Sequence, residues 1–314
     1  MKDLSPPIIV AEIGINHGGD VNKAVQMVRA AAAAGADAVK TQLHIPDEEM
    51  DRALMPSNVW ETIVQCALSE SEERTIQRVA REMGIAYFST PFCRQAVDIL
   101  DGMDVPVIKV GSGEISNHVL LRHIAKTGRP VYLSTGMHQM EAVTRALEIL
   151  PRATLLHCVS KYPCPVEQIG LDRMHALSAL APAGYSSHTP IVMDGVVAAA
   201  MGAQVIEKHF DFDGGVDSKV SLRRIEFSEM VRMIREVMWM RRGEPEPERH
   251  GIAEWARHGL YAAKNLDIGQ ALNDDVAMAR RPLGIGLPAD FPLKGLVCTR
   301  QIAAGAPISI EDVQ

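Results

Sequence analysis

The spacing of apolar residues constrains the fold of this chain more than any other feature of its sequence. From residue 8 to about residue 242, short runs rich in β-branched residues alternate with longer stretches of helical periodicity. The short runs predict strands at 8–14, 38–43, 85–90, 107–112, 130–136, 154–159, 183–188 and 205–210. The longer stretches predict helices, most clearly at 21–34, 71–83, 94–101, 118–127, 140–150, 170–180, 193–201 and 226–241.

Eight strand–helix units predict an α/β fold of the (β/α)8, or TIM-barrel, type. Glycines support the boundaries of these units, because a glycine often caps the C-terminal end of a helix. Such glycines follow four predicted helices, at Gly35, Gly84, Gly128 and Gly202. A doubly wound open sheet is the alternative fold. It usually has fewer units, and no GxGxxG loop follows the first predicted strand.

The chain beyond the barrel predicts a second, smaller domain. Residues 243–251 (GEPEPERHG) are polar and rich in Pro and Gly, which is typical of a linker. Short apolar runs separated by turns then continue to the last residue, 314, and predict a small β-rich module. We therefore expect a barrel domain over 1–242, a linker over 243–254 and a β-rich domain over 255–314. A module of that size needs another surface for stability.

Composition favours a cytoplasmic protein that binds neither nucleic acid nor a membrane. The net charge is -7, aromatic residues make up 4% of the chain, and no basic cluster with interleaved aromatics occurs. The N-terminal segment lacks the apolar run of a signal peptide, and no apolar stretch reaches membrane-spanning length. Five scattered cysteines fit reduced thiols. Two of them, Cys158 and Cys164, are expected to be buried rather than nucleophilic.

Polar residues collect where the predicted strands end, which is where barrel enzymes carry their chemistry. Lys40 and Lys109 lie within apolar runs, where a charge is costly unless it is paired or binds an anion. Together with nearby hydroxyls they would suit a phosphate and a carboxylate. One alternative is a pair of structural ion pairs with Glu12, Glu114 or Glu207. Another is an aldolase that uses one of these lysines to form a Schiff base.

Two histidines end the last two predicted strands, His188 in GYSSHT and His209 in EKHF. Imidazole is the commonest protein ligand of divalent transition metals, and neighbouring strands of one barrel could turn both rings into one pocket. Two protein ligands would leave positions open for water and substrate. A hydrogen-bonded core histidine is the alternative for each, so the residues alone leave the metal site an open question.

The segments that carry these residues form a recognisable series. They are AEIGINHGG (11–19), VKTQLHIPDEEM (39–50), FSTPF (88–92), IKVGSGE (108–114), LSTGM (133–137), LLHCVSKYP (155–163), GYSSHT (184–189) and EKHF (207–210). RRPLG (280–284) and the ending IAAGAPISIEDV follow in the C-terminal region. Over essentially the whole chain the series resembles the sialic acid synthase family, the phosphoenolpyruvate-dependent N-acylneuraminate synthases. The C-terminal region resembles that family's antifreeze-like (SAF) domain, a β-clip fold.

The resemblance implies a transferase that forms a carbon–carbon bond. Such enzymes condense phosphoenolpyruvate with the open-chain aldehyde of an N-acyl mannosamine and release phosphate. The resemblance also implies a divalent metal, usually Mn2+, with Mg2+ or Co2+ as alternatives. It further implies a domain-swapped homodimer in which one chain's antifreeze-like domain covers the partner's barrel. The HIPDEEM segment and Pro56-Ser57-Asn58 resemble the N-acetylneuraminate branch more than the legionaminate or pseudaminate branches.

The same resemblance implies roles for individual residues. The metal ligands would be His188 and His209, and Glu12 and Glu114 would be the acid/base candidates. The residues expected to bind phosphoenolpyruvate are Lys40, Thr90, Lys109, Ser112, Ser134, Ser160 and Ser186. The residues expected to meet the sugar are Gln42, Asn58, Tyr162, Asp217 and, from the partner chain, Arg281.

The sequence departs from the family's pattern in three places. Ser160 stands where Asn is usual, and Ser187 stands before the histidine where Asp is usual. The loop from His209 to Asp217 is short and lacks an Arg-Pro-Gly stretch. These departures motivate one non-enzymatic alternative, a paralogue that binds a sugar or a partner without catalysis. The pairs of histidines and lysines argue against it.

Overall fold

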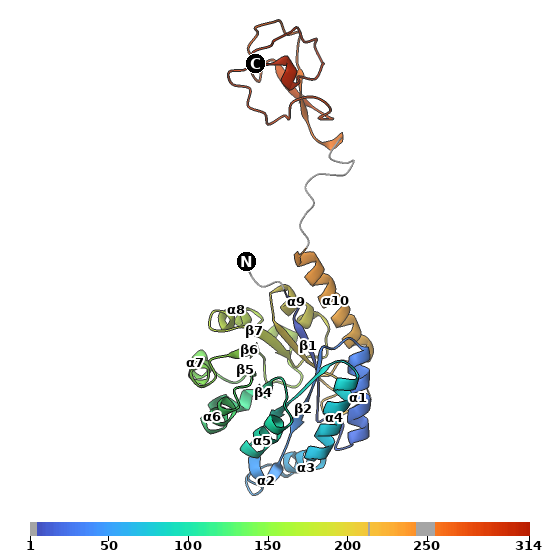
Figure 1. Cartoon of the computed structure of the whole chain (residues 1–314), viewed down its shortest axis with the longest axis vertical. Coiled ribbons are helices and arrows are strands. Elements are labelled where there is room, and N and C mark those ends of the chain that lie inside the picture. Colours follow the sequence, from blue (N-terminus) through green and yellow to red (C-terminus); the bar gives the residue numbers. More distant parts are fainter. Residues whose placement is uncertain (1–4, 213, 243–254) are drawn as a thin grey trace. The chain divides into compact units, whose positions relative to one another are not determined.

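The computed structural model describes residues 5–212, 214–242 and 255–314. The chain divides into two compact units, Met1–Gly243 and Glu244–Gln314 (Figure 1). The predicted linker over 243–254 lies outside the described residues. None of the described helices is both long and apolar enough to cross a lipid bilayer.

The first unit is built on eight parallel strands that form a nearly closed barrel. The hydrogen-bonded order is β3-β2-β1-β8-β7-β6-β5-β4, so the first strand pairs with both the second and the last. This order excludes the doubly wound sheet and confirms the barrel prediction. The strands are β1 (Ile8–Gly14), β2 (Ala38–Leu43), β3 (Ala86–Pro91), β4 (Ile108–Val110), β5 (Val131–Ser134), β6 (Ala153–His157), β7 (Ala183–Ser187) and β8 (Val205–His209).

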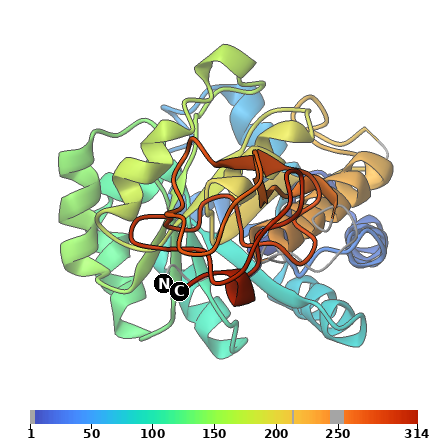
Figure 2. The same ribbon diagram turned by 90° about the horizontal axis from the view of Figure 1, so that it is seen from above.

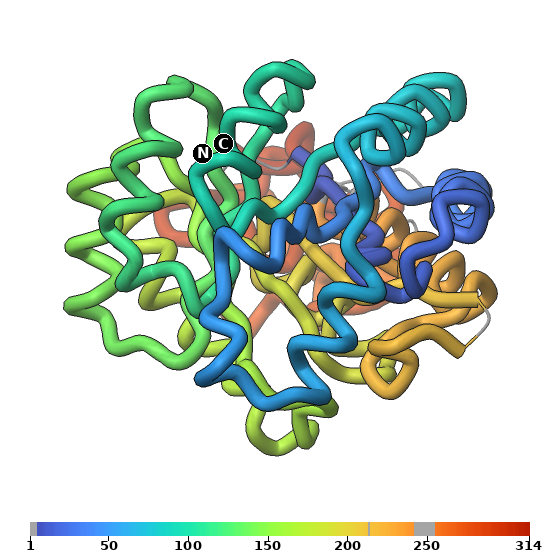
Figure 3. The backbone as a smooth tube through the Cα atoms, turned by 90° about the horizontal axis from the view of Figure 1, so that it is seen from below, coloured from blue at the N-terminus to red at the C-terminus, as the bar shows by residue number. Residues whose placement is uncertain are grey.

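Helices form an outer ring around these strands (Figures 2 and 3). The described helices of this unit are α1 (Val21–Ala33), α2 (Pro46–Glu49), α3 (Ser57–Cys66), α4 (Glu70–Glu82), α5 (Arg94–Gly102), α6 (His118–Lys126), α7 (Met140–Ile149), α8 (Asp172–Ser178), α9 (Met193–Ala200) and α10 (Arg224–Arg242), and all except α2 and α3 belong to the ring. The apolar faces of all these helices except α2 and α3 pack on the outside of the strands in one continuous core, which includes Met27, Ile76, Leu100 and Phe227. The barrel thus holds the strand ends in fixed positions around one axis.

The connection between β2 and α4 differs from the prediction. No helix or strand was predicted between residues 43 and 71, but α2 and α3 occupy this stretch. Helix α3 leaves Val59 and Val64 partly exposed and buries only Cys66, so its apolar stripe is narrow. A short helix of this kind carries a weaker periodic signal than the helices that cover the barrel.

The second unit has a small hydrophobic core of its own. Strands β9 (Gly259–Ala262) and β10 (Ala277–Arg280) pair antiparallel, and isolated bridges connect the surrounding loops. Leu260, Leu266, Ile302 and Ile308 are among its buried residues. The antifreeze-like character of this unit stays a prediction.

A buried polar cluster, the Glu73 cluster, joins α4 to the outer face of β2 and β3. It consists of Glu73, Thr41, Tyr87 and Ser89. The Tyr87 hydroxyl donates to Glu73 Oε2, and Thr41 Oγ1 lies 3.0 Å from the same oxygen. Thr41 Oγ1 also lies 2.9 Å from Ser89 Oγ. Burial raises the pKa of Glu73 to about 7, against hydrogen bonds that favour its charged form.

We expect this carboxyl to make stability depend on pH. Folding raises the pKa of Glu73 above its ordinary value of 4.5, so its stabilising contribution is complete below about pH 4.5. That contribution is lost as pH rises through about 7, and the loss amounts to about 3 kcal/mol. Glu73→Gln should therefore gain stability relative to the wild type between pH 4.5 and 8. Urea unfolding of both proteins across this range measures the difference, and a constant difference would refute the assignment.

Candidate functional site

One cavity of about 360 Å³ opens at the C-terminal ends of the barrel strands. Most of the site residues proposed from the sequence line it. Those residues are Glu12, Lys40, Gln42, Thr90, Lys109, Ser112, Ser134, Ser160, Tyr162, Ser186, His188 and His209. The cavity is also lined by Phe92, Gly111, Gly113, Met137, Cys158 and Glu207.

Four proposed residues do not line this cavity. Asn58 is exposed on α3, and Glu114 is half-buried in the turn after β4, where Asn117 donates to its carboxylate. Asp217 is half-buried, with Oδ2 at 3.6 Å from His209 Nδ1. Arg281 belongs to the second unit, just after β10. Roles for these four stay predictions.

Two lysines and two glutamates form the charged part of the cavity. Glu12 and Lys40 are paired neighbours on β1 and β2, and their side chains form a buried ion pair. From β8, Glu207 Oε1 lies 3.7 Å from Lys40 Nζ and 3.5 Å from Lys109 Nζ. The alternative of structural ion pairs is therefore present for Glu12 and Glu207. Both ammonium groups nevertheless face the cavity, where an anion could reach them.

Burial and neighbouring charges perturb this group. Desolvation lowers the pKa of Lys40 to about 7, although the Glu207 carboxylate opposes the shift. Desolvation alone would raise the pKa of Glu207, but Lys109 and Lys40 outweigh it and hold that pKa below its usual value. Glu207 Oε2 is buried without a hydrogen-bond partner among the described residues. Strongly perturbed groups facing a cavity are typical of functional sites.

Hydroxyl groups surround the lysines. Lys40 Nζ donates to Thr90 Oγ1 at 3.0 Å, and Ser186 Oγ donates to Glu207 Oε1 at 3.1 Å. Ser134 Oγ is buried and has no hydrogen-bond partner within the described ranges, so it is available to a ligand. Position 136 requires a glycine, because a Cβ atom there would lie 2.5 Å from Ser160 Oγ and 2.9 Å from Ser112 Oγ.

The two histidines meet as the strand count predicted. Strands β7 and β8 pair Ser186 with Glu207 and Ser187 with Lys208, so His188 and His209 come next along the two chains. Their ring centroids lie 5.4 Å apart. His188 Nδ1 lies 2.7 Å from the carbonyl oxygen of Val159, an acceptor, so Nδ1 carries the proton. The lone pair is then on Nε2, which accepts a hydrogen bond from the Tyr162 hydroxyl at 2.9 Å.

These residues fit a divalent metal with an open coordination sphere. Burial lowers the pKa of His188 to about 4, and burial together with nearby positive groups lowers that of His209 well below its usual value. Both rings are therefore neutral at pH 7, as metal ligation requires. His209 Nδ1 is buried without a hydrogen-bond partner in the described part of the chain. No group of three or more His, Cys, Asp or Glu that could hold a metal occurs among the described residues.

Strand alternation decides which of the polar residues near the strand ends reach the cavity. Ser89 and Lys208 both lie near strand ends, but their side chains point away from the cavity. Ser89 joins the Glu73 cluster, and Lys208 pairs with Asp194 of α9. Thr135 also turns away and donates to the backbone oxygen of Leu156. Successive side chains of a strand point to opposite faces, so only alternate residues of each motif reach the cavity.

The structure also adds residues that sequence reasoning undervalued. Glu207 was considered only as an ion-pair partner, yet it contacts both lysines inside the cavity. His44 Nε2 lies 3.2 Å from Gln42 Oε1, and His44 Nδ1 lies 2.7 Å from Glu49 Oε1, so these two residues orient Gln42. The buried position of Cys158 and Cys164 is confirmed, and all five cysteines are free.

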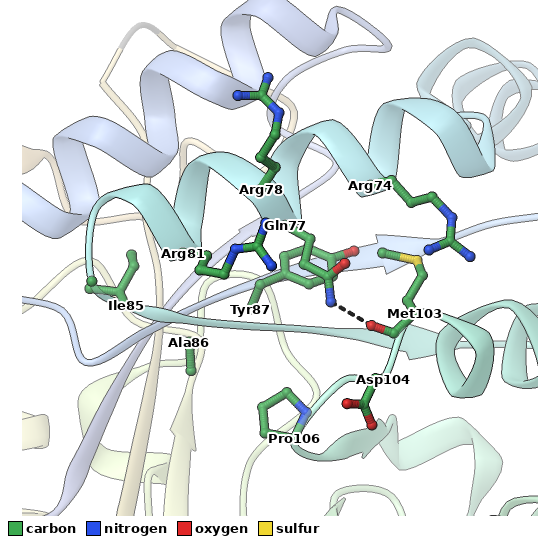
Figure 4. A pocket seen from close by; sticks show the side chains of 11 residues that line it. Arg74, Gln77, Arg78, Arg81, Ile85, Ala86, Tyr87, Met103, Asp104 and Pro106 are labelled. Atoms are coloured by element: carbon green, nitrogen blue, oxygen red, sulfur yellow. Dashed lines mark hydrogen bonds between the residues drawn. The ribbon is translucent and has the colours of Figure 1, made fainter.

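A larger groove of about 760 Å³ lies beside α4 and the start of β3, away from the strand ends that carry the cavity (Figure 4). Its arginines come from one helix, but two of them are already paired along that helix, Arg74 with Glu70 and Arg78 with Glu82. The Gln77 amide donates to the backbone oxygen of Met103 at 2.7 Å. The groove therefore lacks the converging, desolvated charges of the cavity.

Comparison with known proteins identifies the family of this chain. A family model described as the NeuB family matches residues 27–244. N,N'-diacetyllegionaminic acid synthase of Legionella pneumophila is 30% identical over 335 residues, 98% of this chain and 94% of that protein. Human N-acetylneuraminate-9-phosphate synthase is 34% identical over 250 residues, 73% of this chain and 70% of that protein.

A solved structure agrees with these matches. It is that of N-acetylneuraminic acid (sialic acid) synthetase from Leptospira borgpetersenii, in complex with citrate. This structure superposes with a TM-score of 0.74 and 28% identity, covering 80% of this chain and 90% of that chain. Because the family match spans most of the barrel unit and these relatives align over most of their own length, the chain belongs to the NeuB family.

Proposed function

We propose that this enzyme is a phosphoenolpyruvate-dependent synthase of a nine-carbon sugar acid. The favoured reaction condenses phosphoenolpyruvate with N-acetylmannosamine to give N-acetylneuraminate and phosphate. One observation carries the proposal: a single cavity holds two buried ammonium groups on one wall and two neutral imidazoles on another. The ammonium groups suit an anionic enol donor, and the imidazoles suit a polar aldehyde acceptor.

Phosphoenolpyruvate is proposed to bind at the lysine wall. Lys40 and Lys109 supply positive charge for its phosphate and carboxylate, and Thr90, Ser112, Ser134 and Ser186 supply hydroxyl groups. Ser160 also lines the cavity, and it is proposed to be the weakest of these contacts because it stands where the family usually has Asn. Because the lysines are almost fully buried, their attraction for an anion is less screened than it would be at the surface.

The acceptor aldehyde is proposed to lie at the histidine wall. A divalent cation held by His188 and His209, with Mn2+ favoured, supplies Lewis-acid polarisation of the aldehyde oxygen when it is bound. A carbon–carbon bond then forms between the enol methylene and the aldehyde carbon, and the aldehyde oxygen gains a proton. Tyr162 contacts His188, and Gln42 also lines the cavity; both are proposed to position the sugar hydroxyls.

Carboxylates complete the reaction. Water adds to the former enol carbon, gives up one proton, and the carbon–oxygen bond to phosphate breaks. Glu12 is the proposed group that orients or deprotonates this water, because Lys40 holds its carboxylate at the cavity wall. Glu207 is positioned between both lysines and keeps them in place before phosphoenolpyruvate arrives. Lys40 and Lys109 then neutralise the phosphate as it departs.

The assembly remains part of the proposal. The second unit is proposed to be an antifreeze-like domain that covers the barrel of a partner chain in a homodimer. Arg281 would then reach the N-acyl end of the sugar, and Asn58 and Asp217 would line the sugar's path. A cytoplasmic location fits the free cysteines and the absence of a membrane-spanning helix among the described residues.

A phosphate-release assay tests the reaction and the acceptor together. The purified protein is mixed with phosphoenolpyruvate, Mn2+ and either N-acetylmannosamine or the diacetylated and 6-deoxy hexosamine acceptors. We expect phosphate release that needs a sugar, is fastest with N-acetylmannosamine, and is lost with EDTA and restored by Mn2+. A faster rate with a diacetylated acceptor would instead assign the enzyme to the legionaminate or pseudaminate synthases. No release with any sugar would refute the synthase.

The Schiff-base alternative has one observation in its favour: the lowered pKa of Lys40 leaves more of its amine unprotonated at pH 7 and able to attack a carbonyl carbon. Reduction with borohydride in the presence of pyruvate distinguishes it. A covalent pyruvyl adduct on Lys40, together with activity that survives EDTA, would support an aldolase. We expect neither result.

A further inference from the structure

A second buried polar cluster, the Asp194 cluster, lies behind the two histidines. It consists of Asp194, Lys208, Ser187, Thr189 and Tyr185. Lys208 Nζ donates to Asp194 Oδ1 at 2.9 Å, to Ser187 Oγ at 2.6 Å and to Thr189 Oγ1 at 2.9 Å. Lys208 Nζ also lies 3.1 Å from Asp194 Oδ2, so the carboxylate and the two hydroxyl groups together accept all three hydrogens of the ammonium group. The side chains of Lys208 and Asp194 are 0% and 1% exposed.

Both oxygens of the Asp194 carboxylate also have hydrogen-bond partners. Asp194 Oδ2 accepts from Ser187 Oγ at 2.5 Å, from Thr189 Oγ1 at 2.8 Å and from the Tyr185 hydroxyl at 3.1 Å. Its Oδ1 accepts from the backbone N–H of Gly195 at 2.9 Å. One carboxylate in the first turn of α9 thereby joins β7, the loop after it and β8.

The members of this cluster are sequence neighbours of the proposed metal ligands. Ser187 and Thr189 flank His188, and Lys208 precedes His209. Because strand side chains alternate, the cluster binds the outer faces of β7 and β8 while the imidazoles extend from the inner faces. Any change in the spacing of Ser187 and Lys208 therefore changes the spacing of the two rings.

We propose that Asp194 and Lys208 are positioning residues that set the distance and orientation of His188 relative to His209. The inference rests on the proposed metal site. It also explains the departure at Ser187. Ser187 Oγ already lies within hydrogen-bond distance of Lys208 Nζ, so a carboxylate at position 187 would meet the same ammonium group. In this chain Asp194 supplies that carboxylate from the helix instead.

A purely structural role makes a different prediction, which allows a test. Removing one partner of a buried ion pair leaves an uncompensated charge, whereas replacing both partners with apolar residues often restores stability. The double variant Lys208→Met/Asp194→Leu should therefore fold with a melting temperature near that of the wild type. If the pair acts only on stability, this variant should bind metal as the wild type does.

We expect instead that the double variant binds Mn2+ about 10- to 100-fold more weakly, the range found when groups behind metal ligands are altered. Isothermal titration calorimetry of the full chain measures this affinity. The matched control is Glu73→Leu/Tyr87→Phe, which removes the equivalent outer-face cluster behind β2 and β3. Its Mn2+ affinity should stay within about twofold of the wild type. Equal affinities for the wild type and the folded Asp194 double variant would overturn the proposal.

A rescue variant tests whether a carboxylate at position 187 can replace that of Asp194 as the partner of Lys208. Asp194→Ala alone should weaken Mn2+ binding, and Ser187→Asp/Asp194→Ala should recover it to within about threefold of the wild type. The recovery would show that Lys208 needs a carboxylate beside it rather than this particular helix contact. A rescue variant that folds but stays as weak as Asp194→Ala would contradict that part of the inference.

One further measurement distinguishes failure of the positioning role from failure of the proposed metal site. Nitrogen-15 NMR of histidine-labelled, metal-free protein reports the tautomers and hydrogen bonds of His188 and His209. We expect both sets of imidazole signals to change in Lys208→Met/Asp194→Leu and to stay unchanged in the Glu73→Leu/Tyr87→Phe control. If the wild type binds no Mn2+, the proposed metal site fails. Unchanged histidine signals in the double variant would refute the positioning role independently.

Discussion

Replacing His209 with alanine is expected to abolish measurable Mn2+ binding and to lower turnover about 1000-fold. His209 is one of only two imidazoles at the cavity, and its Nδ1 is buried with no hydrogen-bond partner among the described residues. Losing it would leave His188 as a single imidazole ligand, too few to hold a cation at micromolar concentrations. Polarisation of a carbonyl oxygen supplies several kcal/mol of transition-state stabilisation, and about 4 kcal/mol corresponds to that loss in rate.

The control for this variant is His123→Ala. His123 pairs with Asp98 on the outside of the barrel, where Nε2 and Oδ1 lie 2.6 Å apart. We expect His123→Ala to keep Mn2+ affinity and phosphate release within about twofold of the wild type, because an exposed pair contributes little. Metal affinity by calorimetry and turnover by phosphate release should be measured on both variants. Retention of both in a folded His209→Ala protein would show that the metal-site assignment is wrong.

Replacing Lys40 with methionine is expected to have the largest effect on the phosphoenolpyruvate side. Lys40 and Glu12 form an ion pair in which both side chains are buried, so the variant leaves the Glu12 carboxylate without its partner. Breaking such a pair destabilises a protein by about 3 to 5 kcal/mol. For a domain of this size we expect the melting temperature to fall by about 10 °C. The KM for phosphoenolpyruvate should rise about 10- to 100-fold through the lost charge-assisted contact.

The double variant Lys40→Met/Glu12→Gln separates the two effects. Removing both charges should recover most of the melting temperature, but the KM for phosphoenolpyruvate should stay high. As a surface control, Arg232→Met breaks an exposed pair with Glu236 along α10 and should change stability by less than about 0.5 kcal/mol. If Lys40→Met leaves the KM unchanged, the lysine wall does not bind the donor.

The barrel could be predicted from the sequence because its signal is repeated. Each strand has a run of apolar residues and each covering helix has a broad apolar stripe, so small errors at element ends did not disturb the count. The observed strands β1 and β2 match the predicted boundaries, and the others differ by a few residues at most. Helix α3 was missed because only one of its residues is buried, which leaves a pattern too narrow to separate from a loop.

The cavity was predicted in outline for a similar reason. The rule that chemistry lies at the C-terminal ends of barrel strands located the histidines and lysines without knowledge of any distance. It did not distinguish Glu207 from Lys208, because adjacency in the chain does not show which face a side chain takes until the strand register is known. Asp194 was not singled out at all. The sequence held one clue, a lysine within an apolar run at position 208 that required an opposite charge nearby.

The outer-face clusters affect how the shared motifs should be compared among relatives. Segments such as VKTQ, FSTP, SSHT and EKHF each combine residues that face the cavity with residues that hold a strand to a helix. A substitution at the first kind of position changes what the enzyme can bind. A substitution at the second kind can be offset elsewhere, as we propose for Ser187 and the Asp194 carboxylate beside Lys208. Differences within a motif are therefore of two kinds. Those at cavity-facing positions affect which sugar is bound, whereas those at outward-facing positions affect only how a strand is held to a helix.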